Sequence, residues 1–280
     1  MESNHCDDRS GIRAILFDLD NTLIATRGAD KLACNKMAET ITQTYGVPTE
    51  IAKQSCKHFL QEFRKCPEHP STHLDTWRHQ LWYEALPPPY NKFSDAIYQH
   101  WIHLRYNFLQ MSQDIINILK KLRKTYLIGL ITNGPSKSQW EKIHKLNLKS
   151  LFDVILVSGD LPWEKPDEKI FETAYQYLGV RPEHCLMVGD KLETDILGGF
   201  QARLGGTVWV PLNINEMDSK FEPGPDFVID NVTELPKMLK NSYKQPKLRR
   251  KSRDNLRPYN LKSFSEPDFS DCNSNGSDGS

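Results

Sequence analysis

The sequence predicts an α/β fold in which helices cover both faces of a parallel sheet and one long helical segment is inserted. Short apolar runs that end abruptly in polar residues are typical of strands buried in such a sheet. From the second run onward, these runs alternate with helical patterns, as in βαβ units. A long stretch after the first run contains only helical patterns and breaks the alternation. The chain of 280 residues can bury a sizeable core in one large domain or two modest ones.

The elements of this sheet follow from the hydrophobic pattern. The expected strands are residues 12–17, 127–131, 154–157, 186–188, 207–210 and 227–229. The expected helices between them are residues 115–122, 140–146, 170–178 and 195–203. Because helical patterns precede the second to fifth expected strands, we expect the strands to be parallel and the helices to lie on both faces.

The segment from residue 24 to residue 111 is expected to form an all-helical cap. Its helical patterns lie near residues 30–45, 50–63, 74–84 and 95–108, and three turn-forming prolines separate the last two. Because this segment directly follows the first strand, it should lie above the carboxyl end of that strand, where a lid excludes water and selects the substrate. The catalytic core is then expected to comprise residues 11–23 and 112–240.

Both ends of the chain are expected to lie outside these domains. Residues 1–10 are polar and lack the apolar stretch of a signal peptide. Residues 241–280 combine a basic run with a final stretch that is poor in apolar residues, which predicts a disordered tail. The basic run, residues 247–253, is either a solvated part of this tail or a nuclear address.

Composition argues against nucleic acid and membrane partners. The 36 basic and 36 acidic residues cancel, so no overall field attracts a polyanion. No stretch approaches the roughly 18 apolar residues of a membrane span. The six cysteines are scattered without a CxxC pair, which is typical of a reducing compartment and predicts a cytoplasmic location. The sequence leaves the oligomeric state open.

Two aspartates end the first expected strand. Asp18 and Asp20 lie two residues apart directly after an apolar run, and ligands of open α/β sheets bind beyond the carboxyl ends of the strands. Two carboxylates this close repel each other unless a cation or a proton lies between them. The pair therefore indicates a magnesium-dependent site in which one aspartate attacks and the other transfers protons. The competing interpretation is a solvated turn.

Polar residues also end the next three strands along the chain. Thr132 and Asn133 follow the second strand, where a hydroxyl and exposed backbone N–H groups can hold phosphate oxygens. Lys165 follows the third, and its ammonium can neutralise a phosphate and a carboxylate. Asp190 ends the fourth, and Asp195 comes shortly after it. Such oxygen ligands suit magnesium, although Asp195 could instead cap a helix. Convergence at four consecutive strand ends favours one shared site.

These segments resemble the four motifs of the haloacid dehalogenase-like hydrolases. The resemblance rests on Asp18-Leu-Asp20-Asn-Thr, Thr132-Asn133, Lys165-Pro166 and Gly189-Asp190 followed by Asp195, in the order and spacing of the family. It extends over roughly residues 11–239. It implies a Rossmann-like core, a helical C1 cap after the first motif, and phosphatase activity through an aspartyl-phosphate.

The resemblance also implies a role for each motif residue. Asp18 would be the nucleophile, and Asp20 the general acid and then the general base. The phosphate would be bound by Thr132, Asn133, Lys165 and the backbone N–H groups of Leu19 and Asp20. Mg²⁺ would be held by Asp18, the Asp20 carbonyl and Asp190, with Asp195 supporting these ligands. Without this cation and Lys165, an anionic phosphate would be repelled by the carboxylate nucleophile.

Within this superfamily, the chain resembles the N-acylneuraminate-9-phosphatases, which implies hydrolysis of a sialic acid 9-phosphate. Lys191 departs from that pattern, because it stands where a small hydroxyl residue is usual and adds a cation beside the expected metal site. One alternative is the same chemistry on another small sugar phosphate or on phosphoglycolate. A noncatalytic binding protein on a hydrolase scaffold is the alternative from another class, and the intact Asp18, Asp20, Lys165 and Asp190 argue against it.

Overall fold

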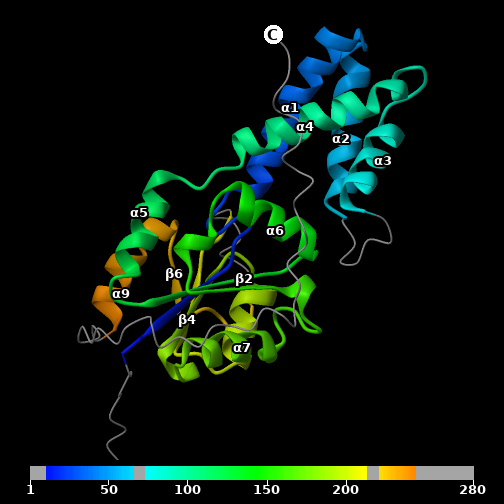
Figure 1. The fold of residues 1–280 in the computed structure, drawn as a ribbon. Helices are drawn as coiled ribbons and strands as arrows, with labels where there is room; N and C mark the ends of the chain where they lie inside the picture. Colours follow the sequence, from blue (N-terminus) through cyan, green and yellow to red (C-terminus); the bar gives the residue numbers. More distant parts are fainter. Residues whose placement is uncertain (1–10, 66–72, 213–220, 244–280) are drawn as a thin grey trace, which may run out of the picture.

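The computed structural model describes residues 11–65, 73–212 and 221–243, and it confirms the predicted α/β fold (Figure 1). The predicted polar segment at residues 1–10 lies outside the described residues. The same holds for residues 244–280, which contain the basic run and nearly all of the predicted tail. No helix in the described ranges is both long enough and apolar enough to cross a membrane.

The predicted strands form one parallel sheet in the order β3-β2-β1-β4-β5-β6. β1 lies between β2 and β4, so the strand order changes direction at β1. In such sheets this point opens a crevice at the carboxyl ends of the two neighbouring strands, here β1 and β4. The strands are β1 (Ala14–Phe17), β2 (Leu127–Thr132), β3 (Val154–Val157), β4 (Cys185–Gly189), β5 (Gly206–Trp209) and β6 (Phe227–Val228).

Apolar clusters bury both faces of the sheet. Along β1, Ile15 and Phe17 belong to one cluster, whereas Ala14 and Leu16 belong to the other, because successive side chains of a strand point to opposite faces. The first cluster includes side chains of α5 (Gln113–Leu122), α6 (Ser136–Lys145) and α9 (Leu235–Ser242). The second includes side chains of α7 (Glu168–Leu178). Helices therefore cover both faces, as Figure 1 shows.

The inserted segment is helical and has an apolar cluster of its own. Phe59 and Trp82 stack at its centre with ring centroids 4.0 Å apart, and Trp101 packs edge-on against Phe59. Figure 1 shows these helices grouped beyond the carboxyl ends of the strands. They are α1 (Thr26–Tyr45), α2 (Thr49–Phe63), α3 (Leu74–Ala85) and α4 (Ser94–Phe108), with a short 3₁₀ turn, η1 (Tyr90–Phe93), before α4.

A buried ion pair joins the inserted helices to the sheet domain. Arg78 of α3 is fully buried, and its Nη1 lies 2.7 Å from Oε2 of Glu141 on α6. Removing one partner of a buried pair leaves an uncompensated charge, so such pairs hold their elements in place. The pair therefore fixes α3 against α6, the helix that follows β2.

Two segments differ from the predicted helices. The expected helix at residues 195–203 is divided into a π-helical turn, η5 (Leu192–Ile196), and the short α8 (Leu197–Gln201). The wider turn carries the Asp195 side chain inward, where it accepts a hydrogen bond from the backbone N–H of Lys191. The alternative of Asp195 as a helix cap is therefore wrong. The helix α9 has no counterpart among the expected elements, and it runs to Ser242, just inside the predicted tail.

Candidate active site

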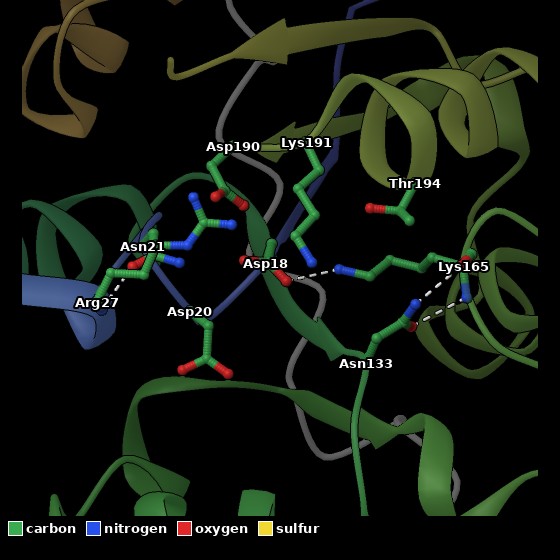
Figure 2. A pocket seen from close by; sticks show the side chains of 9 residues that line it. All are labelled: Asp18, Asp20, Asn21, Arg27, Asn133, Lys165, Asp190, Lys191 and Thr194. Atoms are coloured by element: carbon green, nitrogen blue, oxygen red, sulfur yellow. Dashed lines mark hydrogen bonds and ion pairs between the residues drawn. The ribbon is translucent and has the colours of Figure 1, made fainter. Parts of the chain in front are cut away.

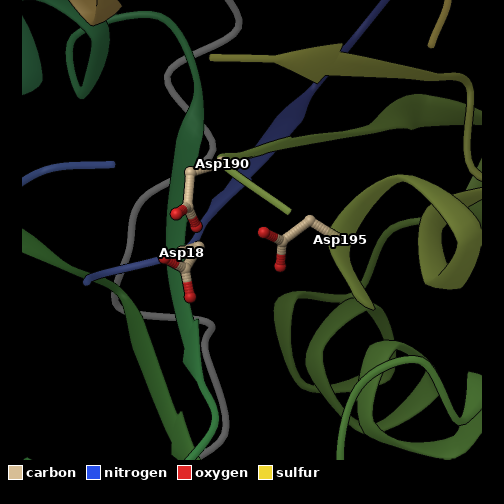
Figure 3. Close-up of side chains that lie close together, drawn as sticks. All are labelled: Asp18, Asp190 and Asp195. Atoms are coloured by element: carbon tan, nitrogen blue, oxygen red, sulfur yellow. The ribbon is translucent and has the colours of Figure 1, made fainter. Parts of the chain in front are cut away.

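Three aspartates from separate segments meet at the point where the strand order changes. Asp18 directly follows β1 and Asp190 directly follows β4, while Asp195 comes from the π-helical turn. All three are buried, and one carboxylate oxygen from each lies within 4.8 Å of the others. Figure 3 shows the three carboxylates facing a common space. Parallel pairing of β1 with β4 explains this, because it places the carboxyl ends of both strands side by side.

The aspartates lie beside a small cavity of about 120 Å³ at the same edge of the sheet. Acidic, basic and amide side chains surround it, which suits a compact anion together with a cation. Figure 2 shows several of these side chains gathered around Asp18, whereas the Asp20 carboxylate points away from it. The lining residues are Asp18, Asp20, Asn21, Arg27, Asn133, Lys165, Asp190, Lys191 and Thr194.

Lys165 lies at the centre of the site and neutralises part of its negative charge. Its Nζ lies 2.6 Å from Oδ1 of Asp18 and 2.7 Å from Oδ1 of Asp195, and it also donates to the Ile131 carbonyl. Burial disfavours the ammonium, but the two carboxylates outweigh this effect and raise the pKa of Lys165 above its usual value. Burial also raises the pKa of Asp18 to about 6, against the opposing charge of Lys165. One ammonium therefore does not balance the acids around it.

Asp190 is the acid whose surroundings best fit a bound divalent cation. Both of its carboxylate oxygens are buried, and neither has a hydrogen-bond partner in the part of the chain that the structure describes. Burial, followed by the charge of Asp18, raises the pKa of Asp190 to about 7. The Trp209 indole donates to the Asp190 backbone carbonyl and fixes this turn. The residues present therefore fit a hard cation between Asp18 and Asp190.

Gly189 allows Asp195 to approach this acidic group. A Cβ at position 189 would lie only 2.2 Å from Oδ2 of Asp195, so a side chain there would push Asp195 aside. Asp195 itself is completely buried. Its Oδ1 pairs with Lys165, and its Oδ2 accepts from the Lys191 backbone. Asp195 therefore orients Lys165 and the turn that follows Asp190.

Asp20 is held apart from Asp18 by a different set of donors. Its Oδ1 accepts from Thr26 at 2.5 Å, and its Oδ2 accepts from Lys142 at 2.5 Å and from Gln139 at 3.1 Å. Burial favours the neutral acid, but Lys142 and the other donors outweigh it and lower the pKa of Asp20 to about 2. These donors favour the ionised carboxylate, so they oppose the protonated state in which Asp20 would act as a general acid.

The predicted phosphate-binding residues have different surroundings. Asn133 lines the cavity, but its side chain also clamps the backbone of Lys165, donating to its carbonyl at 2.8 Å and accepting from its N–H at 3.0 Å. Thr132 is completely buried at the end of β2, and its hydroxyl has no partner among the described residues. The side chain of Leu19 packs in the core, so only its backbone is available for a ligand.

Sequence reasoning missed the residues around Asp20. Gln139 and Lys142 lie three positions apart and therefore on one face of α6. Lys142 is only 3% exposed, which is unusual for lysine. Their spacing indicates a shared helix face, but the sequence did not show that this face of α6 turns toward the carboxyl end of β1. Thr26, at the start of α1, was hidden in the same way.

Comparison with known proteins agrees with this geometry. A family model described as haloacid dehalogenase-like hydrolase matches residues 15–206. The chain is 35% identical to the N-acylneuraminate-9-phosphatase of Homo sapiens over 238 residues, which cover 83% of this chain and 95% of that protein. It is 32% identical to the glyceraldehyde 3-phosphate phosphatase of Methanopyrus kandleri over 232 residues, which cover 80% and 95%.

A solved structure shows the same arrangement of the chain. The HAD phosphatase from Thermococcus onnurineus is 26% identical, with a TM-score of 0.56 over 84% of this chain and 100% of that one. The region matched by the family model contains every predicted site residue from Asp18 to Asp195.

Proposed function

This chain belongs to the haloacid dehalogenase-like hydrolases, and we propose that it hydrolyses an N-acylneuraminate 9-phosphate to the free sialic acid and phosphate with the aid of Mg²⁺. Its assignment as a phosphoric monoester hydrolase follows from the family and from the phosphatases among its relatives. The observation that carries the chemistry is the meeting of Asp18, Lys165 and Asp190 at one cavity. The observation that favours the sugar is the higher identity to the human N-acylneuraminate-9-phosphatase, 35% against 32% for the glyceraldehyde 3-phosphate phosphatase, with 95% of each relative covered.

The proposed reaction has two displacement steps at phosphorus. A carboxylate oxygen of Asp18 attacks the phosphorus, the bond to the sugar oxygen breaks, and Asp20 gives a proton to that oxygen. Asp20 then takes a proton from water, which attacks the aspartyl-phosphate and releases phosphate while restoring Asp18. Dividing the displacement in this way lets one acid/base group serve both steps in turn.

The remaining residues position the phosphate and compensate its charge. We assign phosphate binding to Lys165, to the Thr132 hydroxyl, to Asn133 and to the backbone N–H groups of Leu19 and Asp20. Phosphoryl transfer depends mainly on positioning and charge stabilisation. Two observations support these roles: Lys165 is nearly buried and contacts Asp18, and the Thr132 hydroxyl at the end of β2 has no partner among the described residues.

Asp18, Asp190 and the Asp20 carbonyl are the groups that would hold Mg²⁺. When bound, the ion would neutralise the nucleophile and the phosphate oxygens. Asp195 keeps Lys165 beside Asp18 and fixes the turn after Asp190.

We expect Asp190→Asn to weaken magnesium binding. The variant removes a negative charge from a carboxylate that accepts no hydrogen bond from the described residues, so the Mg²⁺ concentration needed for half-maximal activity should rise by about tenfold or more. Thermal unfolding gives an independent readout, since Mg²⁺ should raise the Tm of the wild-type chain but hardly that of the variant. Glu193→Gln, an exposed acid in the same π-helical turn, is the matched control. An unchanged magnesium response in Asp190→Asn would reject this ligand.

A panel of phosphomonoesters tests the proposed substrate. With Mg²⁺ present, kcat/KM should be at least about tenfold higher for N-acetylneuraminate 9-phosphate than for glyceraldehyde 3-phosphate, phosphoglycolate or a hexose phosphate. Preference for one of the latter would establish the alternative substrate class. If no ester released phosphate, the noncatalytic binding protein would replace the enzyme as the best interpretation.

We place this chain in the cytoplasm as part of the proposal. Cys34, Cys56 and Cys185 are free, buried thiols, which suits a reducing compartment.

A further inference from the structure

Two cationic side chains that line the active-site cavity have no hydrogen bond or ion pair to another described side chain. Arg27 and Lys191 are both exposed, and Figure 2 shows them reaching toward the cavity from different segments. Neither side chain makes a hydrogen bond or ion pair within the described ranges, although the Arg27 backbone N–H donates to Asn21 at 2.9 Å. The third lining cation, Lys165, is already committed to Asp18 and Asp195. Arg27 and Lys191 are therefore available to a ligand.

Their location places them at the mouth of the site. The groups assigned to phosphate binding lie deep, with Lys165 only 2% exposed and Thr132 completely buried. Arg27 directly follows Thr26, whose hydroxyl donates to Asp20, the residue proposed to protonate the leaving oxygen. Arg27 reaches the cavity from the first turn of α1, in the inserted segment, and Lys191 lies at the exposed rim next to Asp190. Once a phosphate fills the inner end, the rest of the substrate meets these two cations.

We propose that Arg27 and Lys191 bind a second anionic group on the leaving-group side of the substrate, which is the carboxylate in a sialic acid 9-phosphate. This inference rests on the proposed function and explains how the site selects its substrate. A guanidinium can hold a carboxylate with two parallel hydrogen bonds, and a nearby ammonium adds a point charge.

A second anionic group distinguishes the substrates named for the two kinds of relative. Their names specify an acidic sugar phosphate and glyceraldehyde 3-phosphate, whose aldehyde and hydroxyl groups carry no charge. Specificity is a difference between the affinities for two ligands. Two cations that are free of other ion pairs favour a phosphate ester with a carboxylate over one whose remaining groups carry no charge.

Calorimetry on the full chain tests this proposal with two ligands that differ at one group. The ligands are N-acetylneuraminate 9-phosphate and its carboxyl methyl ester, titrated with Mg²⁺ into the Asp18→Asn chain so that neither is consumed. The acid should bind at least about tenfold more tightly than the ester. Adding either Arg27→Met or Lys191→Met should lower the affinity for the acid by about tenfold. Either substitution should lower the affinity for the ester by less than about twofold. Lys31→Met, an exposed lysine on the same helix as Arg27, should change neither.

The outcomes separate this inference from the proposed function. If Arg27→Met and Lys191→Met weaken the acid and the ester equally, the two cations bind the phosphate and the inference is wrong. Equal binding of acid and ester to the parent chain also overturns it. Phosphate release by the wild-type chain is measured in parallel, from N-acetylneuraminate 9-phosphate and from p-nitrophenyl phosphate. If phosphate is released but the acid and the ester bind equally, only the second-anion site is refuted. If the acid binds more tightly than the ester but no phosphate is released, the site is supported and the phosphatase is refuted.

Discussion

Asp18→Asn should reduce phosphate release by roughly 10⁴-fold or more while leaving the fold intact. An amide has no negative oxygen with which to attack phosphorus, so the first displacement is lost. The size and shape of the side chain are retained, and Lys165 keeps its contacts with Asp195 and the Ile131 carbonyl. Release of phosphate from N-acetylneuraminate 9-phosphate measures the effect. Asp114→Asn, the same change at an exposed position in the first turn of α5, should leave the rate unchanged.

Stability provides a second readout of the same variant. Burial raises the pKa of Asp18 from 3.8 to about 6, so ionisation of this group opposes folding above pH 6 and no longer does so below pH 3.8. In metal-free protein, Asp18→Asn should therefore raise the Tm at pH 8, and the gain should shrink as the pH falls from 6 toward 4.

Rate and stability together identify the cause of lost activity. Lower activity combined with an equal or higher Tm assigns the loss to chemistry. If the variant kept near-normal turnover, Asp18 would not be the nucleophile.

The sheet was predictable because its strands are buried on both faces. A short apolar run with polar flanking residues, such as Leu127–Thr132, is typical of a strand buried in a parallel sheet. The meeting of the four strand ends was also predictable, because parallel strands bring their carboxyl ends to one edge of the sheet. Asp18 and Asp190 are far apart in the sequence, yet pairing of β1 with β4 makes them neighbours.

Features that depend on tertiary packing were not predictable. The short helix α8 follows a π-helical turn whose Asp195 contacts Lys165, a residue of a loop distant in the sequence. Lys142 looked like an ordinary helix-surface lysine, and only the docking of α6 places it on Asp20. Nothing in the sequence pattern distinguished Arg78 from a surface arginine, and its contact with Glu141 depends on how the inserted helices pack against α6. In each case a charged side chain is buried by a partner from another segment.

Lys165→Met should destabilise the chain by about 3–5 kcal/mol and also abolish most of its activity. The ammonium contacts two buried carboxylates, at 2.6 Å on Asp18 and 2.7 Å on Asp195. A methionine of similar length fills the space but leaves both charges uncompensated. The backbone of residue 165 is clamped by Asn133 through hydrogen bonds of 2.8 and 3.0 Å. The loop should therefore stay in place, and the effect belongs to the lost charge.

Urea unfolding with and without Mg²⁺ measures this loss. Because a divalent ion also compensates the carboxylates, Mg²⁺ should recover part of the unfolding free energy of Lys165→Met. It should restore little of the activity, since the charge beside the phosphate remains missing. Lys169→Met, an exposed lysine on α7, is the matched control and should change stability by less than about 1 kcal/mol. If Lys165→Met were as stable as this control, Asp18 and Asp195 would not depend on the ammonium, and the site would have to balance its charge in another way.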